Sequence, residues 1–118
     1  MADVKSKYGS SGQNLTVTIN SLAHDGMRES AAVDNSADCF LDALVQVQIA
    51  TNTAAASTDD KSVYVYAYGT SDGGTSYSGN ASGSDAAFGT DPQQIGNCRL
   101  LGVVYAPSQN QIYESDLM

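Results

Sequence analysis

The sequence VYVYAY at residues 63–68 is the feature that most constrains the fold of this chain. Small apolar residues and tyrosines alternate there without a fault, and successive side chains of a β-strand point to opposite faces. Branched and aromatic residues suit a pleated surface, and the following GTSDGGTSY supplies the turn-forming residues that end a strand. We therefore expect a central strand with small apolar residues on one face and tyrosines on the other. The tyrosine stripe consists of Tyr64, Tyr66 and Tyr68.

The tyrosine stripe has two interpretations. Tyrosines offer rigid, amphipathic contact area, so the stripe suits an interface with a partner. The same residues also suit the inside of a domain, where they would cover a second sheet and keep their hydroxyl groups at the rim. The sequence leaves both interpretations open.

Three other segments are predicted to be strands. Residues 15–22 (LTVTINSL) and 45–49 (VQVQI) alternate in the same manner, and residues 97–106 (NCRLLGVVYA) form a nearly continuous apolar run. Such a run is typical of a strand that is buried on both faces. Because no crossover helix is evident between them, we expect residues 45–49 to pair antiparallel with residues 63–68.

Three further segments have weaker patterns. Residues 28–32 favour either a short strand or a single helical turn, and residues 38–44 favour either a strand or a helical turn that leads into the next strand. The segment Ile112–Leu117 alternates weakly before the chain ends, and an exposed strand edge there would invite another chain to pair with it.

These elements predict an all-β fold, an antiparallel β-sandwich of jelly-roll type. Residues 1–14 are expected to form an extended arm, and residues 15–118 a single sandwich domain with a long polar loop at 71–94. A sandwich needs about seven strands, which is more than the sequence shows clearly. We therefore expect either a neighbouring chain or a longer natural chain to complete the sheet. The predicted core comprises Val17, Ile19, Leu41, Val45, Val47, Ile49, Val63, Val65, Leu100 and Val103.

The net charge, the lengths of the apolar runs and the two cysteines restrict the class of this protein and its partners. With 13 acidic and 5 basic residues the formal net charge is −8, so nucleic acid and anionic membranes would be repelled. No apolar run approaches the roughly 20 residues that span a bilayer, and the first residues lack the apolar segment of a secretory signal. Cys39 and Cys98 are expected to be small buried residues, and a disulfide between them is disfavoured without an export signal.

No pattern of catalytic or metal-binding residues emerges. His24 lies beside Asp25, but the chain has no Gly-x-Ser-x-Gly elbow and no other histidine. His24 and the two cysteines lack zinc spacing, so we expect no metal and no cofactor. The acidic, Gly-rich loop fits no calcium motif. It is kept as a candidate ligand loop for a sugar or a receptor. Its candidate residues are Asp72, Tyr77, Asp85 and Asp91.

Four segments resemble a family of small proteins encoded by tailed bacteriophages and prophages. They are MADVKSKYG at the start, FLDALVQVQIAT at 40–51, VYVYAYGTSDGGTSYS at 63–78 and RLLGVVYAPSQNQIYES at 99–115. The most specific part of the resemblance is the YAYGTSDGGTSY block with the later RLLGVV strand. Members of the family continue past the IYES segment with further strand-like sequence. The motifs are structural, so the resemblance implies no catalytic residue.

The resemblance implies a non-enzymatic structural protein of the virion, assembled in the host cytoplasm. The favoured role is a decoration or cement subunit that stabilises the head as a homo-oligomer on the major capsid protein or on other virion proteins. The alternatives are a tail or head-to-tail connector component, and a glycan- or receptor-binding module that uses loop 71–94. Many copies on a lattice would supply avidity. Besides the arm, the expected contact residues are Tyr64, Tyr66, Tyr68, Ile112, Tyr113 and Leu117.

Overall fold

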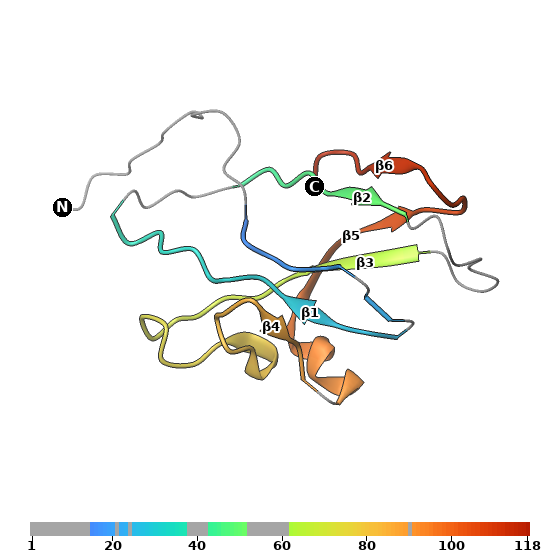
Figure 1. Ribbon diagram of the computed structural model, residues 1–118. Coiled ribbons are helices and arrows are strands. Elements are labelled where there is room, and N and C mark those ends of the chain that lie inside the picture. The colour runs from blue at the N-terminus through green and yellow to red at the C-terminus, as the bar shows by residue number, and fades with distance from the viewer. Residues whose placement is uncertain (1–14, 21, 24, 38–42, 52–61, 90) are drawn as a thin grey trace. The chain divides into compact units, whose positions relative to one another are not determined.

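A computed structural model gives the structure of the protein. It describes residues 15–20, 22–23, 25–37, 43–51, 62–89 and 91–118. These residues form six short strands, paired two by two in antiparallel sheets, and two 3-10 helices (Figure 1). The prediction of an all-β chain is confirmed at this level. The predictions for the arm, for His24 and for residues 38–42, which include Cys39 and Leu41, lie outside the described residues.

The chain divides into two compact units. Unit 1 comprises residues 1–42 and 68–98, and unit 2 comprises residues 43–67 and 99–118. The chain therefore passes between the units at three points, after residues 42, 67 and 98.

Unit 2 contains a ribbon of two antiparallel strands, β3 (Ser62–Ala67) and β5 (Arg99–Tyr105), which lie side by side in Figure 1. Ser62 pairs with Tyr105 at one end, and Ala67 pairs with Arg99 at the other. Gly102 is opposite Val65 whereas Leu100 is opposite Tyr66, so Leu101 is the extra residue of a β-bulge. The strand predicted at 63–68 is confirmed, but β5 is its one strand neighbour among the described residues, so it is not a central strand there.

The second sheet of unit 2 joins β2 (Gln48–Ala50) to β6 (Ile112–Glu114). Backbone bonds extend this antiparallel pairing beyond both strands. On one side the Thr51 N–H donates to the Gln111 carbonyl at 2.9 Å, and on the other the Met118 N–H donates to the Val45 carbonyl at 3.0 Å. One edge of the C-terminal segment is therefore bonded within the chain along its length.

The predicted pairing of residues 45–49 with residues 63–68 is wrong. Residues 45–51 bond to the C-terminal segment instead, and β3 takes β5. Ser115 stabilises the observed pairing with two hydrogen bonds to Val47. Its Oγ accepts from the Val47 N–H at 2.9 Å, and its backbone N–H donates to the Val47 carbonyl at 2.8 Å. Gln48 Nε2 also donates to the carboxylate of Glu114, its cross-strand partner, at 2.8 Å.

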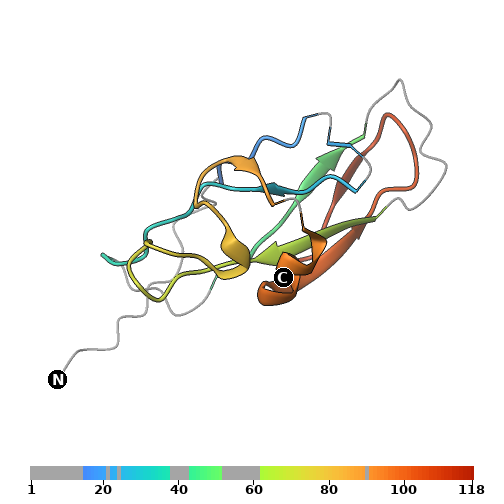
Figure 2. The same ribbon diagram turned by 90° about the horizontal axis from the view of Figure 1, so that it is seen from below.

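Unit 1 contains a small sheet of β1 (Arg28–Glu29) and β4 (Ala86–Ala87), which run beside each other in both views (Figures 1 and 2). Two 3-10 helices, η1 (Ser78–Asn80) and η2 (Pro92–Asn97), flank β4 in the sequence. The Phe88 N–H extends the pairing by donating to the Met27 carbonyl at 3.0 Å. Of the two structures predicted for residues 28–32, the short strand is confirmed.

The strand predicted at residues 15–22 is wrong. The described part of this segment has no strand, and a turn closes where the Leu22 N–H donates to the Ile19 carbonyl at 3.2 Å. The Thr16 carbonyl accepts from the Ala31 N–H at 2.8 Å, but a single bond of this kind does not build a ladder. The apolar residues of the segment stay exposed, with Val17 and Ile19 each at 40%.

The described residues bury few apolar side chains, namely Ile49, Ala81, Phe88 and Val104. Of the predicted core, Ile49 is buried, and Val45, Val47, Val63 and Val65 are half-buried. The prediction is wrong for Val17 and Ile19, and also for Leu100 and Val103, which are 50% and 47% exposed. The reason is that β5 lies in a two-stranded ribbon and buries Val104 on one face only.

Candidate interaction surface

One face of the β3–β5 ribbon carries large side chains that are open to solvent. Antiparallel partners project to the same face, so Tyr64 shares its face with Val103, and Tyr66 shares it with Leu100. Tyr105, which is opposite Ser62, continues the row. We call these five residues the tyrosine face. Their exposed fractions are 52% for Tyr64, 38% for Tyr66, 50% for Leu100, 47% for Val103 and 64% for Tyr105.

The β-bulge explains how this face forms. In a regular strand Leu100 and Val103, three positions apart, would project to opposite faces. The extra residue Leu101 shifts the alternation by one position, so Leu100 and Val103 project to one face, beside the exposed tyrosines. None of the five residues is charged, although the whole chain has a formal net charge of −8.

The predicted tyrosine stripe is divided by the structure. Tyr64 and Tyr66 belong to the tyrosine face, but Tyr68 follows β3 and belongs to unit 1. The half-buried Tyr68 donates its hydroxyl hydrogen to the Ser30 carbonyl at 2.5 Å and meets Tyr77 edge to face, with ring centroids 5.5 Å apart. Burial raises the pKa of the Tyr68 hydroxyl. Tyr68 thus fastens local structure in unit 1.

The C-terminal contact residues lie in or beside β6. Ile112 and Leu117 are 65% and 57% exposed, as a contact surface requires. Tyr113 is half-buried, and its hydroxyl oxygen accepts from the Ser108 N–H at 3.0 Å, which closes the turn before β6. Ile112 and Leu117 therefore remain candidate contact residues, and Tyr113 has a structural bond of its own.

Asp72, the first of the four candidate ligand residues, accepts hydrogen bonds from its own turn. Its carboxylate accepts from the Thr70 hydroxyl at 2.6 Å, from the Thr75 N–H at 3.0 Å and from the Ser76 N–H at 2.9 Å, and also from the Ser76 hydroxyl. These hydrogen bonds, above all those from Ser76 and Thr70, lower the pKa of Asp72 well below its ordinary value. The carboxylate thus organises the turn.

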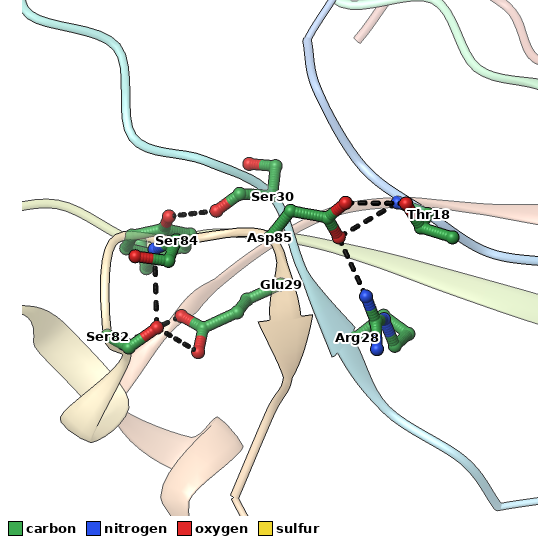
Figure 3. Close-up of polar contacts among 8 residues, drawn as sticks. Thr18, Arg28, Glu29, Ser30, Ser82, Ser84 and Asp85 are labelled. Atoms are coloured by element: carbon green, nitrogen blue, oxygen red, sulfur yellow. Dashed lines mark hydrogen bonds and ion pairs between the residues drawn. The ribbon is translucent and has the colours of Figure 1, made fainter.

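Asp85, the second acidic residue of that loop, joins three segments of unit 1 (Figure 3). Its carboxylate accepts from the Thr18 N–H at 2.9 Å and from the Thr18 hydroxyl at 2.5 Å. The Arg28 guanidinium of β1 forms an ion pair with it at 2.8 Å. The hydrogen bonds from Thr18, together with Arg28, lower the pKa of Asp85 to about 2. Asp85 therefore holds the 15–20 segment against β1.

Glu29, the neighbour of Arg28 on β1, is a buried carboxylate that the sequence reasoning missed. It is 5% exposed, and it accepts from the Ser82 N–H and the Ser82 hydroxyl, both at 2.8 Å (Figure 3). Ser82 Oγ in turn accepts from the Ser84 N–H at 3.2 Å. The residue lies in a strand of two residues, so no periodic pattern in the sequence could have predicted its burial.

The remaining residues of the predicted ligand loop also have structural partners. Asp91 caps η2 by accepting from the Gln93 N–H at 2.9 Å. The half-buried Tyr77 ring packs so closely on Gly83 that a Cβ there would lie 2.6 Å from it. Within the described residues no group of three or more His, Cys, Asp or Glu side chains could hold a metal ion. Asp72, Asp85 and Asp91 thus each bond to different partners.

Cys98 lies beside η1 and forms no disulfide. Its thiol is half-buried and lies 3.9 Å from the Ser78 carbonyl oxygen. Burial raises the pKa of the Cys98 thiol, so the neutral thiol predominates at neutral pH. The prediction that Cys98 is a small buried residue is therefore met only in part, because the side chain is half-buried.

Acid is expected to weaken the fold through Asp72 and Asp85. A carboxyl group with a lowered pKa in the folded state stabilises the fold above its unfolded pKa of about 3.9. That stabilisation is lost as the pH falls from about 4 to about 2, where Asp85 is protonated. Urea unfolding of the wild type should therefore show a falling free energy of unfolding across this range.

The variant Asp85→Asn is expected to be less stable than the wild type at pH 7 and to show a smaller loss of stability between pH 4 and pH 2. Asp116→Asn removes the same charge from an exposed position and serves as the control. Equal pH dependence in Asp85→Asn and the wild type would show that the bonds from Thr18 and Arg28 do not stabilise the fold.

The described structure is thus that of a β-rich protein with a solvent-facing tyrosine face and with acidic side chains that bond to other groups of the chain. Comparisons of the chain with protein-family models, curated proteins and solved structures find no match. Among the residues that the structure describes, none lies in a helix both long and apolar enough to cross a membrane.

Proposed function

We propose that this chain is a non-enzymatic structural subunit of a bacteriophage virion, and that it decorates and stabilises the head by oligomeric contacts. The observation that carries the proposal is the tyrosine face. Exposed tyrosine-rich surface is typical of protein interfaces, and the largest exposed apolar patch of a soluble protein is often a functional one. The resemblance of the 63–78 and 99–115 segments to phage proteins supplies the context.

The sheets of unit 2 suit a subunit that is completed by assembly. β3 and β5 form a ribbon of two strands, and an isolated ribbon is marginally stable unless another layer covers it. We propose that neighbouring subunits supply that layer and complete a sandwich of jelly-roll type. The arm predicted from the sequence at residues 1–14 would then contact the major capsid protein or another virion protein, as would the exposed Ile112 and Leu117.

The acidic composition supports a protein-binding role in the particle. A formal net charge of −8 would repel the packaged nucleic acid, and this supports a position on the outside of the shell. A lattice multiplies weak contacts, because each additional attachment point of an oligomer binds with a high effective concentration. A small face on each copy is therefore sufficient for stable attachment.

Quantitative mass spectrometry of purified phage particles tests the proposal. Peptides of this chain should occur in the particles with a copy number comparable with that of the major shell protein. A copy number equal to a single ring of subunits would assign the chain to the tail or to the head-to-tail connector instead. Absence of the chain from particles of the phage that encodes it would overturn the proposal.

A further inference from the structure

The tyrosine face has the size of a contact between small proteins. Three tyrosines, a leucine and a valine, each about half exposed, present about 500 Å² of surface. This area is at the upper end of the exposed apolar patches found on monomers. Two such faces in contact would bury about 1,000 Å² in total, which reaches the lower limit for a specific interface.

The charge of the chain restricts what can cover this face. Each copy has a formal net charge of −8, which opposes self-association, so two copies can meet only where no like charges are buried in the contact itself. The tyrosine face is such a surface, since all five of its side chains are neutral. A two-fold axis that lies between two facing ribbons brings the same patch of both copies together, and no second complementary surface is then required.

From this geometry we infer that the first partner of the tyrosine face is a second copy of the chain. Two β3–β5 ribbons stack face to face about a two-fold axis, about 10 Å apart, and form a four-stranded, two-layer sandwich. Tyr64, Tyr66 and Val103 lie in the contact. The inference rests on the proposed function, because it names the subunit that covers this face in the assembly.

Sedimentation equilibrium of the full chain from about 1 μM to about 1 mM tests the inference. The wild type should form a dimer, and Tyr64→Arg should weaken the dimer at least about 100-fold, because two like charges would then be buried across the axis. Leu44→Arg, which adds the same charge at a position 72% exposed and outside the tyrosine face, should leave the dimer unchanged. Circular dichroism confirms that each variant is folded.

A second measurement does not depend on a disruptive substitution. Photochemical oxidation joins tyrosine rings that lie in contact, so the dimer should yield a covalent dityrosine product between chains. The double variant Tyr64→Phe/Tyr66→Phe keeps the apolar rings, and it should still dimerise while losing most of this product. Tyr113→Phe, a change outside the face, should retain the product.

Three results would overturn the inference. One is a wild type that stays monomeric over the whole range. Another is a dimer that Tyr64→Arg leaves intact, because a different surface would then join the copies. The third is a monomer in which Tyr64 and Tyr66 are protected from oxidation, since another part of the same chain would then cover the face.

The two proposals fail separately. A monomer whose tyrosine face becomes protected from oxidation only on purified shells would contradict the proposed dimer and support the proposed virion role. A protein that dimerises in solution but is absent from phage particles would support the proposed dimer and contradict the proposed virion role.

Discussion

Replacement of Phe88 by alanine is expected to lower the free energy of unfolding by about 3–5 kcal/mol. Phe88 is 7% exposed and is the largest of the buried apolar side chains in the described residues. Its backbone N–H bonds to Met27, so the side chain is fixed at the point where β4 ends. Removal of the ring leaves a cavity beside Gly79 of η1. Urea unfolding followed by circular dichroism measures the loss.

Two matched variants make this prediction specific. Phe88→Leu keeps most of the apolar volume and should cost less than about 1.5 kcal/mol. Val33→Ala shortens a side chain that is 71% exposed and should change the stability by no more than about 0.5 kcal/mol. If Phe88→Ala cost no more than Val33→Ala, the ring would not belong to a packed core.

The variant Gly79→Ala should lose about 3 kcal/mol of unfolding free energy, the sum of a backbone and a packing penalty. Gly79 has a φ of +66°, which favours glycine over any residue with a Cβ. A Cβ at this position would lie 2.7 Å from Cys98 Sγ, 2.9 Å from the Phe88 ring and 3.0 Å from the Gln94 carbonyl oxygen. The backbone at Gln94 cannot move without disturbing η2.

Gly73→Ala separates the two penalties. Gly73 has a similar φ of +72°, but nothing lies within 4 Å of a Cβ placed there. It should lose only the backbone part, about 1–2 kcal/mol. In a Cys98→Ala background, Gly79→Ala should cost less, because the nearest clash is removed. Equal losses for Gly79→Ala and Gly73→Ala would contradict the close packing around η1.

The sequence predicted those elements whose cause is local. The strand at 63–68, for example, follows from the alternation of small apolar residues and tyrosines. The pairing of residues 45–51 could not be predicted in this way. Their partner is selected by bonds to Ser115 and Glu114, more than sixty residues away, and alternation does not record which strand lies alongside.

The tyrosine face shows the same limit at the candidate site. Tyr64 and Tyr66 were predicted to share a face, and they do. Leu100 and Val103 were assigned to the core because a continuous apolar run is typical of a strand buried on both faces. The bulge at Leu101 brings these two residues to the tyrosine side, and a bulge leaves no signal in a run of apolar letters. The apolar run therefore helped to build a surface.

The pairing of Ala67 with Arg99 has a consequence for how this chain could vary. The two residues are cross-strand neighbours, so the segment between them, residues 68–98, leaves the ribbon and returns to it at the same end. The entropic cost of closing a loop depends only weakly on its length, so a longer or shorter segment could connect the two strands without altering the β3–β5 pairing. A chain built in this way can vary the length of the exposed polar turns in this segment while its tyrosine face stays constant.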